Sequence, residues 1–315
     1  MELSYLAKDK SSCYYLTVPN IERGEIGLRK DVYYQRGAAD PILDDNTVLE
    51  IVRQFVPNAG MVKYIDETGG EARTYAVDGS VILKVQRPQQ LRMSTSLEKE
   101  ALFLKELEKQ TDVRVPRVLG YERRETLEYI CMTRIPGIKV EDTKLTKEEK
   151  NALLLELGKE LRKIHGIDQT PILESGLFPR DEPSDLVDRL QRRYQNEALR
   201  KKDNISTEKL NGVLAAIENE LKNIRDTDVF TALHVNPYIC HVFVDGKTHK
   251  YTGLIDFGDS YIGHPIFDMW YWKADSRKTL LRGYTSERPV SAAFQVIFDT
   301  VNTISKMVQE LCANS

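Results

Sequence analysis

The spacing of apolar positions predicts strands in the first part of the chain. Short apolar runs bounded by polar residues recur before about residue 134, at 61–65, 73–77, 81–85, 117–121 and 127–132. Turns at Gly69-Gly70 and Asp78-Gly79 separate the first three runs, which predicts an antiparallel meander. One helical pattern interrupts the series, with apolar Leu97, Ala101, Leu104 and Leu107. The first part is therefore predicted to be β-rich.

Helical spacing predominates after residue 134. Thr146 and Glu149 form a capping-box pattern, and the helix that it opens has the apolar face Leu153, Leu154, Leu157, Leu161 and Ile164. A second amphipathic helix is predicted over 210–224, and a third helical stretch over 290–311. Two short strands, 241–244 and 252–255, interrupt them as a hairpin with a turn at Asp245-Gly246. The predicted fold class is α+β, with a β-rich part followed by a helical part.

The first 45 residues stand apart from this scheme. Two strand-like pieces, CYYLTVP and DVYYQRG, predict a hairpin appended to the main body. A helix is predicted over 47–56, where Pro57 ends the apolar spacing. The predicted division is an extension over 1–45, a first lobe over 46–133 and a second lobe over 134–315.

Composition narrows the class of protein. The chain has 41% apolar and 30% charged residues, as in soluble globular proteins, and its net charge of −3 gives no basic field for nucleic acid or anionic lipid. No apolar run approaches the roughly 20 residues that span a bilayer, and the first residues lack the order of a signal peptide. The four cysteines have no paired spacing, which indicates reduced thiols. A cytoplasmic protein without nucleic-acid or membrane partners is expected.

The predicted hairpin after residue 240 carries the candidate chemistry. A hairpin brings the start of its first strand beside the end of its second, so His241 and Asp256 become neighbours. An imidazole and a carboxylate at one end of a hairpin can share a divalent cation. Gly258 lets the backbone turn sharply beside them. On geometry alone, a polar hairpin rim explains the same pattern.

These residues resemble the catalytic segment of the aminoglycoside phosphotransferase and choline kinase superfamily, which has the protein-kinase fold. That family's pattern is H-x-D, then an asparagine, then a strand, a turn and I-D-F-G. Here it reads His234-Val235-Asn236, then His241 in the asparagine slot, then Ile255-Asp256-Phe257-Gly258. The 2″-type aminoglycoside phosphotransferases usually have histidine at that position. The resemblance implies that His241 and Asp256 bind Mg²⁺, and that Asp268 is the family's buried aspartate. His264 departs from the acidic residue usual before the following proline.

The resemblance extends over about residues 58–300 in matching order. It implies that Lys84 contacts the phosphates of ATP or GTP and that Glu100 is its ion-pair partner, Glu98 being the alternative. It also implies a hinge at 129–137 whose backbone holds the purine, Met132, Thr133 and Arg134 included, and a phosphate-cradling loop at Gly69-Gly70. A structural place beneath the loop is assigned to His234, and no role to His165, His249 or His264. The implied architecture is a two-lobed protein-kinase-like fold.

Asn236 occupies the position of the family's catalytic aspartate. A neutral amide cannot accept the proton of the acceptor hydroxyl, although its oxygen can still align that hydroxyl. An engineered inactivation, a natural slow enzyme and a pseudoenzyme all explain this residue.

Two functions from different classes follow. One is a phosphotransferase acting on a small hydroxyl-bearing, cationic acceptor of the aminoglycoside or amino-sugar type, with Asp259 facing the acceptor. Acidic residues Asp181, Glu182, Asp185 and Asp188 either line its pocket or form a solvated surface. The other is a kinase-like pseudoenzyme that binds nucleotide or docks a partner.

Overall fold

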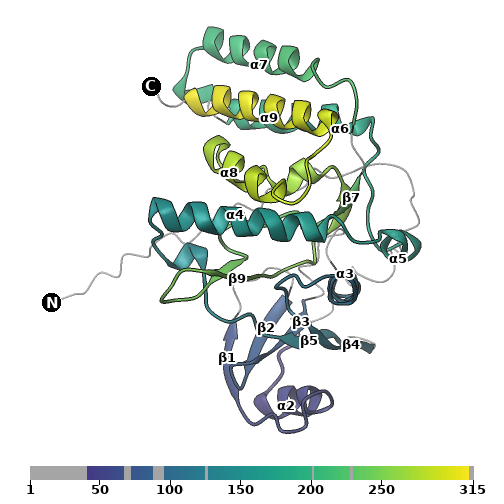
Figure 1. Ribbon diagram of the computed structural model, residues 1–315. Helices are drawn as coiled ribbons and strands as arrows, with labels where there is room; N and C mark the ends of the chain where they lie inside the picture. Colours follow the sequence, from purple (N-terminus) through teal and green to yellow (C-terminus); the bar gives the residue numbers. More distant parts are fainter. Residues whose placement is uncertain are drawn as a thin grey trace, which may run out of the picture.

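The computed structural model describes residues 41–66, 72–87, 96–124, 127–200, 202–227 and 230–311. Figure 1 shows a lobe built on one sheet and a larger lobe of stacked helices, with a β-ribbon between them. The α+β class and the two-lobed arrangement predicted from the sequence are confirmed. Among the described residues, no helix is long and apolar enough to cross a membrane.

The first lobe is a five-stranded antiparallel sheet. Its spatial order is β1-β2-β3-β5-β4, in which β3 is central. The strands are β1 (Val62–Asp66), β2 (Ala72–Val77), β3 (Val81–Gln86), β4 (Val118–Arg124) and β5 (Leu127–Thr133). All four adjacent pairs are antiparallel, and the pairs β1–β2 and β2–β3 form the predicted meander. The predicted strand runs therefore pair with one another.

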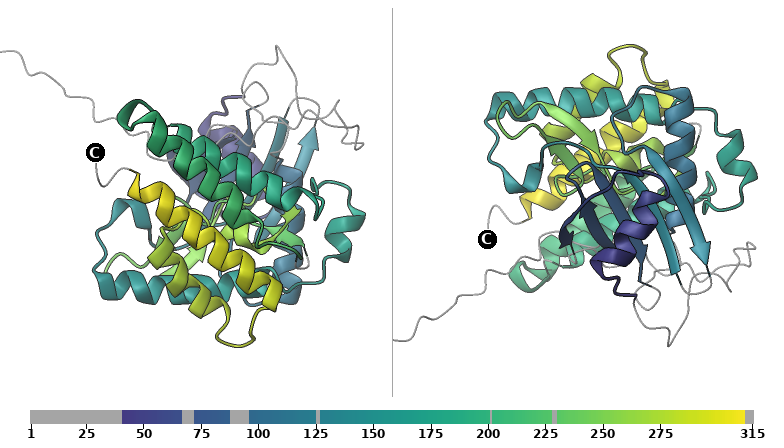
Figure 2. Two further views of the ribbon diagram at one scale, coloured as in Figure 1. Left: turned by 90° about the horizontal axis from the view of Figure 1, so that it is seen from above. Right: turned by 90° about the horizontal axis from the view of Figure 1, so that it is seen from below.

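A helix covers each face of this sheet (Figure 2). Because side chains alternate along a strand, Leu83 and Val85 of β3 pack with helix α2 (Asp45–Arg53), and Ile82 packs on the side of α3 (Leu97–Gln110). Lys84 has the parity of Ile82 and so faces α3 and the second lobe. Helix α2 begins earlier than predicted because Asp44 caps it by accepting a hydrogen bond from Thr47 N.

The second lobe stacks helices in layers that run away from the sheet in Figure 1. They are α4 (Lys147–Ile164), α8 (Ala274–Tyr284), α6 (Asp185–Leu199), α9 (Ala292–Glu310) and α7 (Thr207–Leu221), with the short α5 (Thr170–Glu174) at one side. The capping box of Thr146 and Glu149 at the start of α4 is present. Helices α4 and α8 pack closely through two glycines: a Cβ on Gly158 would lie 2.2 Å from Leu280 O, and one on Gly283 2.1 Å from Leu155 O. Sequence spacing did not predict α6 and α8.

Short strands place the candidate chemistry at the junction of the lobes. One sheet has the order β6 (Ile138–Lys139), β8 (Val242–Val244) and β9 (Tyr251–Leu254), and the other pairs β7 (Thr231–Leu233) with β10 (Tyr261–Gly263). The 3₁₀ helices are Val140–Asp142, Lys202–Asn204 and Pro265–Asp268. The predicted hairpin is β8–β9, in which Val242 pairs with Leu254. The hairpin predicted within 1–45 lies outside the described residues, which begin at residue 41.

Candidate active site

Three charged side chains from different elements form the centre of the site. Lys84 Nζ lies 2.8 Å from Glu100 Oε2 and 2.7 Å from Asp256 Oδ1. These contacts join β3, α3 and the segment after β9. The carboxylate of Asp256 is 41% exposed, whereas that of Glu100 is 1% exposed. Lys84 therefore contacts a buried carboxylate, that of Glu100, on one side and a partly exposed one, that of Asp256, on the other.

The charges of this cluster stabilise one another. Burial alone would lower the pKa of Lys84, but Asp256 and Glu100 raise it above its ordinary value. Burial would raise the pKa of Asp256, yet the positive charge of Lys84, together with the adjacent imidazole of His241, outweighs this and holds it well below its usual range. Burial raises the pKa of Glu100, and Lys84 partly offsets the rise. A cationic Lys84 facing an anionic Asp256 is thus the stable state at neutral pH.

His241, directly before β8 of the β8–β9 hairpin, extends this cluster. Its Nε2 lies 3.2 Å from Asp256 Oδ2, and its Nδ1 lies 2.9 Å from the backbone oxygen of Asn236. A carbonyl oxygen only accepts hydrogen bonds, so Nδ1 carries the hydrogen. A neutral His241 then directs the lone pair of Nε2 at a carboxylate oxygen. The pair needs a shared positive charge, which a proton or a metal cation supplies.

This donor set fits a divalent cation that also binds phosphate. Metal-binding histidines commonly donate their other ring N–H to a backbone carbonyl, as His241 does to Asn236. Mg²⁺ typically takes one or two protein ligands and completes its shell with water and phosphate oxygens. Within the described residues there is no group of three or more His, Cys, Asp or Glu side chains that could hold a metal ion. His241 and Asp256 are therefore a pair of possible ligands, and the other ligands of such a cation would be water or phosphate oxygens.

A buried carboxylate shapes the loop that bears Asn236. Asp268 is fully buried and accepts hydrogen bonds from His234 N at 2.9 Å and Val235 N at 2.5 Å. Val235 adopts φ +83°, a left-handed conformation that costs energy for a β-branched residue. Asp256 is also left-handed, at φ +73°. The loop geometry is thus imposed by Asp268 rather than by local preference.

His165 is the member of this network that sequence reasoning missed. Its Nε2 lies 2.9 Å from Asp268 Oδ2, and its Nδ1 lies 3.0 Å from the Tyr284 hydroxyl. It sits at the C-cap of α4, so it ties that helix to the loop. Its position directly after the apolar face of α4 indicates a partly buried histidine. Its partners Asp268 and Tyr284 lie about a hundred positions away, so the sequence did not reveal them.

His234 has the structural place expected of it. Its Nε2 lies 2.8 Å from Ile255 O, its Nδ1 accepts from Asn236 N at 3.2 Å, and its ring meets Phe257 edge-on. Burial lowers the pKa of His234 to about 4. The imidazole is therefore neutral and connects the Asn236 loop to the strand that ends at Asp256.

The start of α3 is tied to the segment after Asp256. Phe257 N donates to Glu100 Oε1 at 3.3 Å, and Ser96 N donates to Gly258 O at 3.3 Å. The rings of Phe103 and Phe257 lie edge-on, 5.3 Å apart. Glu100, rather than the alternative Glu98, is therefore the partner of Lys84. The two lobes meet through the same residues that carry the charge.

The predicted site residues Asn236 and Asp259 lie in the segments between β7 and β8 and between β9 and β10. Asn236 is half-buried, and its side-chain amide makes no hydrogen bond to the described residues. Asp259 is half-buried and follows the Asp256 segment by three positions. The Gly69-Gly70 turn lies outside the described residues.

The hinge predicted at the end of β5 has most of its backbone amides engaged. Thr133 N donates to Arg117 O at 2.9 Å, and Arg134 N donates to Ser80 O at 2.8 Å. Ile135 N, the next amide, donates to none of the described residues. The backbone amides of Thr133 and Arg134 are therefore engaged within the protein, whereas the Ile135 N–H has no acceptor among the described residues.

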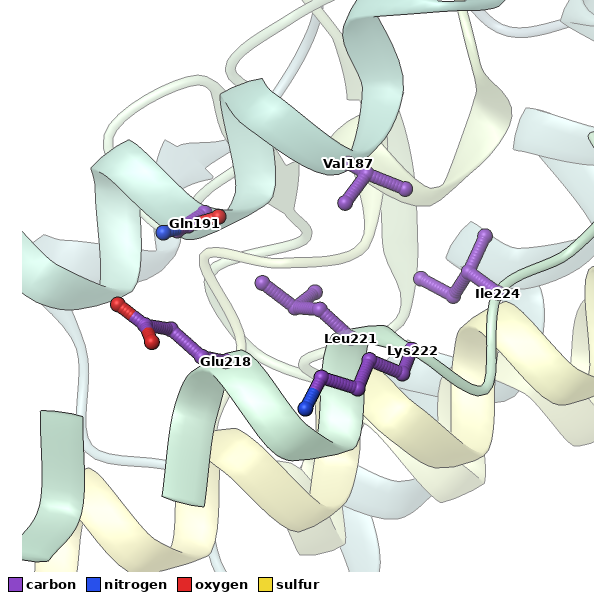
Figure 3. A pocket seen from close by; sticks show the side chains of 6 residues that line it. All are labelled: Val187, Gln191, Glu218, Leu221, Lys222 and Ile224. Atoms are coloured by element: carbon purple, nitrogen blue, oxygen red, sulfur yellow. The ribbon is translucent and has the colours of Figure 1, made fainter. Parts of the chain in front are cut away.

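The acidic cluster near the start of α6 is not gathered into one pocket. Asp181 pairs with Arg189, while Glu182 and Asp188 are exposed to solvent. A groove between α6 and α7 is lined by Val187, Gln191, Glu218, Leu221, Lys222 and Ile224 (Figure 3). None of the predicted site residues borders this groove, so it is separate from the Lys84 cluster.

Comparison with known proteins places these features in a family. The model of the phosphotransferase enzyme family matches residues 66–287. The fold resembles the gentamicin complex of APH(2″)-IIa, with a TM-score of 0.56 and 18% identity over 84% of this chain and 87% of that one. It also resembles the GDP complex of wild-type aminoglycoside 2′-phosphotransferase-IIIa, with a TM-score of 0.59 and 14% identity over 87% and 94%.

A third structure with the same fold has another acceptor. The complex of spectinomycin phosphotransferase APH(9)-Ia with ADP and spectinomycin matches with a TM-score of 0.55 and 14% identity, over 87% of this chain and 90% of that one. The fold is therefore shared by proteins whose acceptors differ.

Proposed function

The chain belongs to the phosphotransferase enzyme family, and we propose that it transfers the γ-phosphoryl group of ATP or GTP to a hydroxyl of a small molecule. One observation carries this proposal: Lys84, Glu100, Asp256 and His241 form a continuous chain of contacts that ends at the backbone of Asn236. In phosphoryl transfer the protein mainly positions groups and neutralises charge, and these side chains suit both tasks.

Each residue of the cluster is given a role. Lys84 gives up its ion pair with Asp256 and binds nucleotide phosphates instead. Glu100 keeps the Lys84 ammonium group in position. His241 and Asp256 would hold Mg²⁺, which would supply positive charge against the phosphate groups. Residues 46–133 form the nucleotide-binding lobe, and the hinge and Gly69-Gly70 complete its site.

The acceptor is bound by the second lobe, residues 134–315. Asn236 accepts a hydrogen bond from the acceptor hydroxyl and aligns it, and Asp259 faces the same molecule. An aminoglycoside or similar amino-sugar is the first class to test, because several structures of this fold have such acceptors. Without a general base at Asn236, turnover is expected to be slower by about 10²- to 10⁴-fold. We place this reaction in the cytoplasm, where ATP and GTP are available.

Restoring the aspartate tests the enzyme directly. The Asn236→Asp variant should transfer phosphate from MgATP or MgGTP to a member of an amino-sugar and aminoglycoside panel about 10²- to 10⁴-fold faster than the parent chain. Asn236→Asp combined with Lys84→Met is the matched control and should lose that gain. If the variant stays inert across the whole panel, acidic amino-sugars included, while nucleotide still binds, the enzyme proposal is wrong.

Asn236 itself favours a second candidate, a nucleotide-binding pseudoenzyme. In that case MgATP or MgGTP raises the melting temperature of the parent chain, and Asn236→Asp produces no transfer. The absence of any nucleotide-induced shift would contradict both candidates.

A further inference from the structure

Three arginines contact residues on either side of Asp268: Arg189 lies over the Phe267 ring, and Arg193 and Arg277 contact the aromatic segment that follows. Two of the three guanidinium groups have polar partners within the protein. Arg277 is buried and donates to the carbonyl oxygens of Met269, Trp270 and Trp272 and to the side chains of Asn302 and Ser305. Arg189 pairs with the carboxylate of Asp181. These two guanidinium groups are neutralised or saturated within the protein.

Arg193 is the exception. Its guanidinium carbon lies 3.3 Å from the centroid of the Trp270 ring and 5.6 Å from that of Tyr271. No described residue accepts a hydrogen bond from it or forms an ion pair with it. Stacking fixes the plane of a guanidinium while its N–H groups keep their capacity to bind oxygen atoms. Arg193 is therefore an oriented set of donors without an acceptor.

The surroundings of Arg193 make an anionic partner favourable. The side chain is half-buried on α6, and burial lowers the pKa of its guanidinium. Glu197, one turn further along α6, attracts this charge but forms neither a hydrogen bond nor an ion pair with it. A partly desolvated guanidinium without a direct acceptor costs free energy that a bound carboxylate or phosphate would recover. Arg192, its neighbour on the same helix, is exposed to solvent and has no such need.

An aromatic ledge connects Arg193 with the Asn236 loop. We use this name for Tyr238, Trp270 and Tyr271. The rings of Tyr238 and Tyr271 lie 6.0 Å apart, and those of Trp270 and Tyr271 lie 6.2 Å apart. Trp272 Nε1 donates to Pro237 O at 3.1 Å, which fixes the ledge to the residue directly after Asn236. An acceptor whose hydroxyl reaches Asn236 would extend over this ledge towards Arg193.

We propose that Arg193 binds an acidic substituent, a carboxylate or a phosphate, of the acceptor, and so selects acceptors that carry one. The inference rests on the proposed function and narrows it: the amino-sugar or other polyol bears a negative group at a distance from the reacting hydroxyl. The bidentate fork of arginine suits either anion. A purely polycationic acceptor would place positive charge against Arg193 and bind weakly.

Tryptophan fluorescence measures binding at this ledge without turnover. The chain has two tryptophans, Trp270 and Trp272, and both belong to this segment. Matched probes are glucosamine 6-phosphate against glucosamine, galacturonate against galactose, and inorganic phosphate alone. The acidic member of each pair should bind roughly 10- to 100-fold more tightly than its partner. Glucosamine 6-phosphate should also bind more tightly than inorganic phosphate.

Variants assign this preference to one side chain. Arg193→Gln should abolish it, Arg193→Lys should keep part of it, and Arg192→Gln, which removes the same charge nearby, should leave it unchanged. Equal binding within both pairs, no binding of either acidic probe, or an equal loss in Arg192→Gln would overturn the inference. Inorganic phosphate binding as tightly as glucosamine 6-phosphate would show an adventitious anion site and overturn it too. The transfer assay on Asn236→Asp, with MgATP thermal shifts as a check of nucleotide binding, tests the proposed function separately.

Discussion

The side chain of Asp268 accepts a hydrogen bond from Val235 N at 2.5 Å, although the two residues lie 33 positions apart. This contact holds a valine at φ +83°, directly before Asn236. The loop that presents Asn236 is therefore defined by a carboxylate from a different segment. The stabilisation by the Asp268 hydrogen bonds and the strain at Val235 can both be measured as changes in unfolding free energy.

Asp268→Asn should destabilise the protein and loosen the Asn236 loop. The charged carboxylate accepts from His234 N, Val235 N and His165, and an amide cannot replace all three bonds with equal strength. We expect the free energy of unfolding in urea to fall by about 2–4 kcal/mol. Asp188→Asn, an exposed carboxylate on α6, is the control and should change it by less than about 0.5 kcal/mol. Equal stability of the two variants would show that the network is not needed.

Replacing Val235 tests the backbone strain. Val235→Gly and Val235→Ala both remove the valine side chain, but only glycine adopts φ +83° without a steric penalty. The glycine variant should be more stable than the alanine variant by about 1–2 kcal/mol in urea unfolding. At an ordinary position with negative φ the order reverses, so a more stable alanine variant would contradict the strain.

The buried imidazole of His234 should make stability depend on pH. Its folded-state pKa is about 4, below the ordinary value of 6.5, so between these values the unfolded chain binds more protons. Stability is therefore full above about pH 6.5 and decreases as the pH falls towards 4. Between pH 7 and pH 5 this residue should account for about 2 kcal/mol of lost unfolding free energy. His234→Gln removes the titrating group, so the difference in unfolding free energy between the parent protein and this variant should be smaller by that amount at pH 5 than at pH 7. A difference that stays constant with pH would exclude His234 as the origin.

The histidine at the start of the ribbon should govern the Mg²⁺ dependence of nucleotide binding. Since His241 Nε2 faces Asp256 Oδ2 at 3.2 Å, His241→Ala should weaken binding of MgATP or MgGTP roughly 10- to 100-fold by calorimetry. Binding without Mg²⁺ should change little. His249→Ala, at the turn of the same ribbon where His249 contacts Glu149, is the matched control. A similar loss in both variants, or one that persists without Mg²⁺, would rule out a metal role.

Local patterns in the sequence determined much of the architecture. Alternating apolar runs predicted all five strands of the first lobe, and the pair Thr146 and Glu149 predicted the start of α4. The hairpin turn at Asp245-Gly246 was enough to bring His241 beside Asp256, because pairing across a short ribbon depends on nearby residues. These features are local, so short windows of sequence contain them.

Only the tertiary structure decided which distant side chains complete the site. Asp268 and His165 meet from segments 103 positions apart, and Lys84 and Asp256 from segments 172 apart. Arg193 became informative because folding supplies polar partners for Arg189 and Arg277, whereas among the described residues Arg193 has aromatic neighbours but no hydrogen-bond acceptor or ion-pair partner. Such pairings depend on how whole helices and strands pack together. The apolar spacing within one element shows which face is buried but not which element packs against it.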